Sequence, residues 1–90
     1  MFKFDELDLT EQFEDSYQGL QERVQKQCDK ALGFLLTNPD HPGLNFKPIQ
    51  PSKIYWEAKI NAGDRLIVRP EGSVVHVMDA VTHDEIARWG

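Results

Sequence analysis

Apolar and polar residues alternate most regularly along residues 54–61. The apolar members of this stretch are Ile54, Trp56, Ala58 and Ile60. A period of two is typical of a β-strand that has one face in the protein core. After a turn at residues 62–64, residues 65–69 are expected to return as an antiparallel strand, and a second turn leads to a third strand over residues 74–79. The pattern therefore predicts a β-meander from Ile54 to Asp79.

The length of the first turn decides which face of the sheet each side chain takes. A two-residue loop would place Arg65 opposite Ile60, on the core face. A three-residue loop instead pairs Asn61 with Arg65 and turns Leu66 and Val68 into the core beside the apolar residues of the first strand. We therefore expect the three-residue loop. The outer face of the sheet then carries the charged residues Glu57, Lys59, Arg65 and Arg69.

The first half of the chain has the spacing of helices. Thr10 has the chemistry of an N-cap and acidic residues follow it, so a helix is expected to begin there. Gly19 is expected to separate this helix from a second one, which ends at Thr37 because Pro39 biases the residue before it away from helix. The apolar stripe of the two helices comprises Phe13, Tyr17, Leu20, Val24, Cys28, Ala31, Leu32, Leu35 and Leu36.

Shorter elements complete the predicted architecture. Residues 2–4 are a candidate first strand, residues 44–49 a candidate edge strand bounded by prolines, and residues 82–89 a capped helical turn or a tail. Helices followed by strands indicate an α+β fold. We expect two antiparallel helices packed on one face of a small antiparallel sheet, in the order β-α-α-β-β-β. A chain of this length is expected to form one domain, residues 1–90.

The net charge of −5 is unevenly distributed. Residues 1–40 carry nine acidic and four basic side chains, whereas residues 41–90 carry six of each. Proteins dedicated to nucleic acids are usually basic overall, because contacts to phosphate supply most of their affinity. The composition therefore leaves only a local basic patch in the second half as a route to RNA or DNA.

Several expectations concern the environment of the protein. No apolar run approaches the roughly 20 residues of a membrane helix, and the first residues turn acidic where a secretory signal would be apolar. The single cysteine, Cys28, cannot form an internal disulfide and falls on the core stripe. Three dispersed histidines lack the spacing of zinc ligands. We therefore expect a cytoplasmic protein without membrane contact, metal or other cofactor.

One ordered set of motifs resembles a known family. A helix ends in Leu-x-x-Asn-Pro-x-His-Pro-x-Leu at residues 35–44, a strand with Lys47 follows, and the hairpin reads Tyr-Trp-Glu-Ala-Lys-Ile and then Asp-Arg-Leu-Ile. A final strand then ends in His83-Asp84. Over nearly its whole length this resembles the RelE/ParE-like toxins of bacterial type II toxin–antitoxin systems. In this group some members cleave mRNA on the ribosome, some poison DNA gyrase, and some have no known activity.

The resemblance implies a metal-free ribonuclease. In that reaction the ribose 2′-hydroxyl attacks the adjacent phosphorus, which requires a base, an acid and fixed positive charge. Arg65 matches an arginine that clamps phosphate, and His83 matches a histidine that transfers protons. Glu57 is a candidate general base by strand parity alone, independently of the resemblance. The residues expected to hold the RNA backbone are Lys47, Lys59 and Arg69.

This chain also departs from the family pattern. Ile49 stands near the position of a catalytic glutamate in some members, Lys59 stands where others carry a histidine, and Asp84 replaces a frequent tyrosine. Each candidate also has a purely structural interpretation. Arg65 can be an ordinary exposed arginine beside a turn, and His83 an ordinary helix-start residue. The charged residues of the hairpin can be cross-strand ion pairs.

Two functional hypotheses follow from the sequence. The first is a toxin-like mRNA endoribonuclease. The second is a non-catalytic binding module of the same fold, either of the gyrase-inhibitor type or a decayed toxin that acts through protein contacts. The expected partners are a cognate antitoxin, which would cover the helix pair or the charged sheet face with an amphipathic helix, mRNA on the ribosome, and a second copy of the chain. His76 is expected to point to solvent or a partner, and Trp89 to cover the sheet or an interface.

Overall fold

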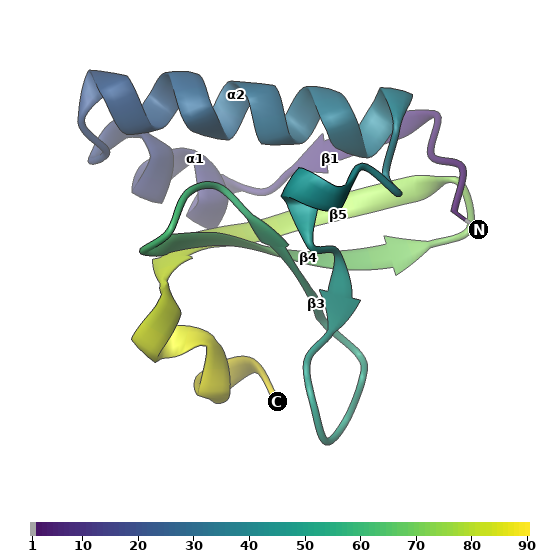
Figure 1. Ribbon diagram of the computed structural model, residues 1–90. Coiled ribbons are helices and arrows are strands. Elements are labelled where there is room, and N and C mark those ends of the chain that lie inside the picture. Colours follow the sequence, from purple (N-terminus) through teal and green to yellow (C-terminus); the bar gives the residue numbers. More distant parts are fainter. Residues whose placement is uncertain (1) are drawn as a thin grey trace.

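The computed structural model describes residues 2–90, and within them it has two α-helices and a five-stranded sheet (Figure 1). Along the chain the elements are β1 (Glu6–Leu9), α1 (Glu11–Gln18), α2 (Glu22–Thr37), the 3-10 turn η1 (Pro42–Leu44), β2 (Lys47–Pro48), β3 (Trp56–Lys59), β4 (Asp64–Glu71), β5 (Val74–Thr82) and the 3-10 helix η2 (His83–Trp89). The strand order is β1-β5-β4-β3-β2. Neighbouring strands are antiparallel except for the parallel pair of β1 and β5. The predicted α+β class is confirmed.

The helices begin and end where the sequence predicts. The Thr10 side chain accepts a hydrogen bond from the Phe13 backbone N–H at 3.3 Å, which satisfies one open donor at the start of α1. Gly19 ends α1, and α2 runs to Thr37. Of the predicted stripe, Leu36 remains 38% exposed.

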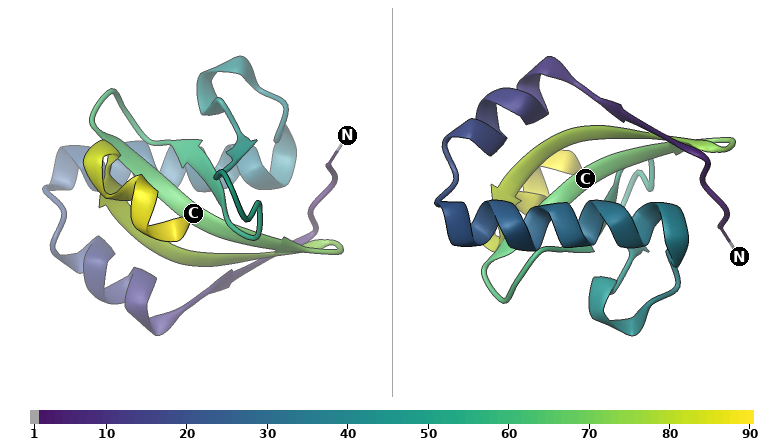
Figure 2. Two further views of the ribbon diagram at one scale, coloured as in Figure 1. Left: turned by 90° about the horizontal axis from the view of Figure 1, so that it is seen from below. Right: turned by 90° about the horizontal axis from the view of Figure 1, so that it is seen from above.

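The main core lies between the two helices and one face of the sheet (Figure 2). Burying an apolar side chain such as valine or leucine completely stabilises the fold by roughly 1.5–3 kcal/mol relative to leaving it exposed. Those with almost no exposed surface include Cys28, Leu35, Leu66, Val68, Val75 and Val77.

A β-bulge lets β5 contribute to both faces of the sheet. Ile67 pairs with Asp79 but Val68 pairs with Val77, so Met78 is the extra residue. Without it, Val77 and Asp79 would point to the same face. With it, Val77 packs under the helices while the end of β5 turns Val81 to the opposite face.

The opposite face holds a second, smaller core, which corrects the expectation of an open charged surface. The helix η2 lies across this face, on the side away from α1 and α2 (Figure 1; Figure 2, left). Trp89 packs edge-on against Tyr55 with ring centroids 4.9 Å apart. Trp89 therefore covers the sheet. The buried members of this second core are Ile49, Ile67, Val81 and Ile86.

Other details of the strands also differ from the sequence prediction. Lys59, and not Asn61, pairs with Arg65, because the Asn61 side chain accepts bonds from the Gly63 and Asp64 backbone N–H groups and forms its own turn. The predicted three-residue loop is therefore wrong. The observed register differs from the predicted one by two residues, which equals the side-chain period of a strand. Leu66 and Val68 therefore still point into the main core, as predicted.

The predicted ends of two strands are also wrong. β3 begins at Trp56 and leaves Ile54 57% exposed. The first strand is residues 6–9, while Phe4 is a buried core residue outside any strand. The edge strand predicted within residues 44–49 is confirmed as β2. Within residues 2–90, no helix is both long and apolar enough to cross a membrane.

Candidate functional site

A cavity of about 600 Å³ opens between β2, β3 and η2, on the second face of the sheet. Three of the predicted site residues line it, namely Lys47, Glu57 and His83. Lys47 and Glu57 are directly opposite each other on β2 and β3, so their side chains leave the sheet on the same side. The apolar wall comes from Ile49 and Ile86 of the second core.

Glu57 and Arg65 form an ion pair behind this cavity. The Arg65 Nε lies 3.7 Å from the Glu57 Oε1, and each side chain is 11% exposed. The Arg65 Nη1 also donates to the backbone oxygens of Asn61 at 2.6 Å, Asp64 at 3.0 Å and Ala62 at 3.3 Å. These hydrogen bonds hold the Arg65 guanidinium against the β3–β4 turn. Arg65 is not among the residues that line the cavity.

His83 is exposed and begins η2 at the mouth of the cavity. Its backbone N–H donates to the Gly63 oxygen at 2.9 Å, which fixes its main chain against the β3–β4 turn. The predicted capping box supports this start, because the Glu85 carboxylate accepts bonds from both the backbone N–H and the hydroxyl of Thr82. These bonds hold the pKa of Glu85 below its usual value.

The two remaining predicted residues lie elsewhere. Lys59 is exposed and contributes to a separate cavity next to α2. Arg69 is near the far end of β4, where its Nη1 lies 3.5 Å from a Glu71 oxygen. The structure thus brings together Lys47, Glu57 and His83, with Arg65 behind them.

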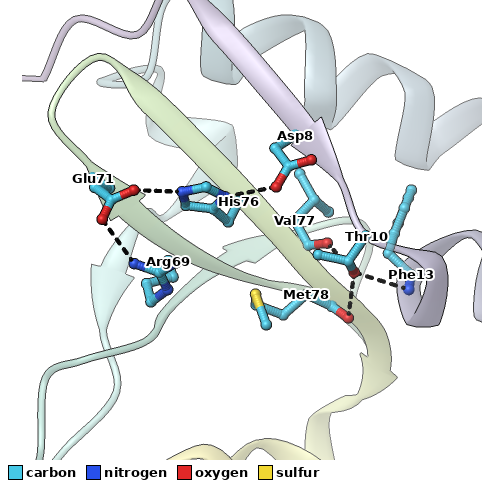
Figure 3. A network of polar contacts seen from close by, with 8 residues as sticks. All are labelled: Asp8, Thr10, Phe13, Arg69, Glu71, His76, Val77 and Met78. Carbon is cyan, nitrogen blue, oxygen red and sulfur yellow. Dashed lines mark hydrogen bonds and ion pairs between the residues drawn. The ribbon is translucent and has the colours of Figure 1, made fainter.

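Arg69 belongs to a network that the sequence did not reveal (Figure 3). The His76 ring bridges the Asp8 carboxylate, 2.7 Å from Nδ1, and the Glu71 carboxylate, 2.9 Å from Nε2. These bonds, the one to Asp8 first, raise the pKa of His76. The bond from His76 and the charge of Arg69 lower the pKa of Glu71. This network joins β1 to the β4–β5 hairpin and lies on elements other than those that form the cavity.

Two further polar residues line the cavity without having been predicted to act there. Asp84 follows His83 and stood out only as a departure from the family pattern, and Gln50 carried no signal of its own. The cavity therefore offers an ammonium, an imidazole, two carboxylates and an amide. Such a set can move protons and bind a polar or anionic group.

No protein-family model and no curated protein match the sequence. Solved structures do match. The YoeB/ParE toxin from Agrobacterium tumefaciens has a TM-score of 0.72 and 21% identity over 87% of this chain and 98% of that chain. YafQ from E. coli has a TM-score of 0.73 and 20% identity over 93% and 97%. The RelB–RelE antitoxin–toxin complex from Methanococcus jannaschii gives 0.72 and 11% over 91% and 96%. At these identities the similarity establishes the architecture, and the chain has the RelE/ParE-like toxin fold.

Proposed function

We propose that this protein is the toxin of a bacterial type II toxin–antitoxin system and cleaves mRNA in the cytoplasm as an endoribonuclease. The observation that carries the proposal is the cavity of about 600 Å³ in which Glu57, His83 and Lys47 meet. It is supported by the fold, which the chain shares with YoeB, YafQ and RelE toxins.

The chemistry needs three groups and no metal. Glu57 accepts the proton of the ribose 2′-hydroxyl as its oxygen attacks the adjacent phosphorus. His83 donates a proton to the departing 5′-oxygen, and the Lys47 ammonium compensates the charge that develops on the phosphorane. The products are a 2′,3′-cyclic phosphate on one fragment and a 5′-hydroxyl on the other.

We assign Arg65 a positioning role in this scheme. Its pair with Glu57 and its bonds to the turn fix the carboxylate in the cavity wall. Its direct contact with phosphate, implied by the family resemblance, stays a prediction. The same holds for RNA contacts of Lys59 and Arg69, which lie outside the cavity.

A cognate antitoxin is the proposed protein partner. Its binding surface would be an apolar cavity of about 400 Å³ lined by residues of β1, α1 and α2. Leu9, at 41% exposure, supplies an apolar contact, and Glu14 and Asp29 add acidic side chains to the lining. An amphipathic helix with basic flanks matches this surface. The solved RelB–RelE and DinJ–YafQ structures, which share this fold, are toxin–antitoxin complexes.

A non-catalytic binding module is the second candidate. The Glu57–Arg65 pair favours it, because each charge is largely satisfied by the other and by the turn. Ile49 favours it too, since the cavity has an apolar wall near the position where the resemblance places a catalytic glutamate in some members.

Induced expression in a bacterium separates the candidates. We compare wild type, His83→Ala, and Arg88→Ala as a control on the same helix, because the Arg88 side chain is 79% exposed and lies outside the cavity. Growth arrest with cut transcripts that is lost only in His83→Ala supports the ribonuclease. Arrest with DNA damage and intact mRNA indicates a gyrase inhibitor. Absence of arrest indicates a binding module.

A further inference from the structure

A third cavity, smaller than the two described above, lies where α2, η1 and the end of β3 meet. Its volume is about 180 Å³, below the 300–1,000 Å³ that is typical of sites for whole small molecules. It therefore suits a single small group. The polar side chains in its lining are Gln27, Lys30, His41 and Lys59.

The lining of this recess presents donors. The Gly43 backbone N–H donates to Nδ1 of His41 at 2.9 Å, so the ring proton resides on Nε2, which is a donor. The Gln27 Oε1 accepts a bond from the Asn61 amide at 2.8 Å, which leaves the Gln27 NH₂ group to donate. Two lysine ammonium groups complete the set. The residues that line this small space therefore carry four donor groups.

The charge of the recess is the reverse of that of the whole chain. Its lining includes no carboxylate, although the chain carries 15 acidic residues and a net charge of −5. Among residues 2–90, neither Lys30 nor Lys59 forms an ion pair within 4 Å. The Lys30 ammonium lies 5.9 Å from the centroid of the Phe34 ring, and the same ring stacks on His41 with centroids 4.1 Å apart. Donors and uncompensated positive charge favour an anion.

We infer that this recess binds one phosphate group of the RNA strand whose cleavage is proposed above, and the inference rests on that proposed function. Lys59 follows Glu57 by two residues on β3, which is about 7 Å along a strand. The recess lies on the α2 side of the sheet and the larger cavity on the η2 side. An RNA chain that leaves the larger cavity at Glu57 would therefore pass round the exposed end of β3 at Lys59 to reach the recess. The recess anchors the backbone and the larger cavity holds the reacting phosphate.

The test uses a single-stranded RNA with 2′-O-methyl riboses, which cannot undergo 2′-hydroxyl attack. Fluorescence anisotropy gives its affinity for wild type and for Lys30→Gln with Lys59→Gln over a range of salt concentrations. The matched control is Lys26→Gln with Lys53→Gln, which removes two exposed lysines outside the recess. We expect about tenfold weaker binding in the recess variant alone. Because one phosphate contact is lost, the slope of log affinity against log salt should fall in magnitude by about 0.7. Inorganic phosphate is titrated in parallel, followed by the amide NMR signals of Gly43 and Lys59.

Each outcome decides the inference. A loss of affinity confined to the recess variant supports it, even where wild type cuts no RNA, so the failure of the proposed activity is a separate result. Equal affinities of the recess and control variants overturn it, as does a wild type that binds no oligonucleotide. Phosphate-induced shifts at Gly43 with unchanged oligonucleotide affinity also overturn it, because the recess then takes free phosphate.

Discussion

Replacing Arg65 by alanine tests whether this arginine stabilises the fold through its contacts or is free to bind phosphate. Its guanidinium contacts Glu57 and three backbone oxygens of the β3–β4 turn. Arg65→Ala leaves the 8%-exposed Glu57 without its cation and removes the donor to those carbonyls. We therefore expect a substantial loss of stability from a residue that the sequence places beside a turn.

The magnitude follows from the burial. Removing one partner of a fully buried pair costs roughly 3–5 kcal/mol, whereas an exposed pair is worth about 0–1 kcal/mol. Both side chains are 11% exposed, so we expect about 3 kcal/mol for Arg65→Ala, the lower end of the buried range. Glu57→Gln keeps the shape and loses only the charge, and should cost about 1 kcal/mol.

Urea denaturation measures both effects. For a small domain with an m-value of about 1.5 kcal/mol/M, Arg65→Ala should lower the midpoint by about 2 M. Arg88→Ala, with a 79% exposed side chain, serves as the control. In a double-mutant cycle, Arg65 and Glu57 should show a coupling of about 1–2 kcal/mol. If the free energy of unfolding of Arg65→Ala lies within about 0.5 kcal/mol of that of the control, the contacts of the guanidinium do not stabilise the fold and the positioning role is refuted.

The remaining predictions concern other parts of the fold. Bonds to Asp8 and Glu71 raise the pKa of His76 above its usual 6.5, so the stability they add is complete below that pH and is lost as the pH rises through the folded-state pKa. Urea midpoints of wild type and Asp8→Asn should therefore differ at low pH and converge at high pH, and a constant difference would contradict the linkage. Burial raises the pKa of Cys28 to about 12, so a thiol reagent should label Cys28 only in the unfolded protein, and rapid labelling of the native protein would contradict its burial. Trp89→Ala should cost about 2 kcal/mol in thermal unfolding, because it removes a half-buried ring from the second core; a loss below about 0.5 kcal/mol would mean that η2 adds little packing.

Local signals in the sequence were sufficient for most elements. The cap at Thr10, the break at Gly19 and the stripe along α2 depend on neighbouring residues only, and all are found in the structure. The facing of the β3–β4 hairpin was also predictable, because a shift of two residues leaves side-chain parity unchanged.

Long-range pairing was not predictable in the same way. β1 pairs in parallel with β5, about 70 residues away in the chain, and no local pattern encodes that choice. No local pattern predicts the bulge at Met78 either, yet because of it β5 contributes side chains to both cores. For the same reason the charged outer face was predicted as open. Within residues 82–89 only Trp89 was expected to cover the sheet, with an interface as the alternative.

The candidate site divides along similar lines. Strand parity put Glu57 on the outer face, and the capping-box pattern placed His83 at the start of the last helical turn. The pairing of Lys47 with Glu57 was not predicted from parity. Parity could not reveal that Arg65 bends back to its own turn, since that depends on side-chain geometry. Lys30 and Gln27 carried no signal, because they lie on the polar face of a helix and gain meaning only through the approach of η1.

The larger cavity and the smaller recess differ in charge, and under the proposed function this difference would allow an acidic protein to hold RNA. The larger cavity pairs Lys47 with Glu57 and Asp84, so it has acids and bases but little net attraction for a polyanion. The smaller recess carries Lys30 and Lys59 and no carboxylate, so it attracts a polyanion but lacks the carboxylate base of the larger cavity. Separate placement keeps the lysines away from Glu57, whose carboxylate would otherwise bind them in place of phosphate. On this reasoning, loss of the recess weakens RNA binding and leaves the chemical step intact, whereas loss of His83 does the reverse.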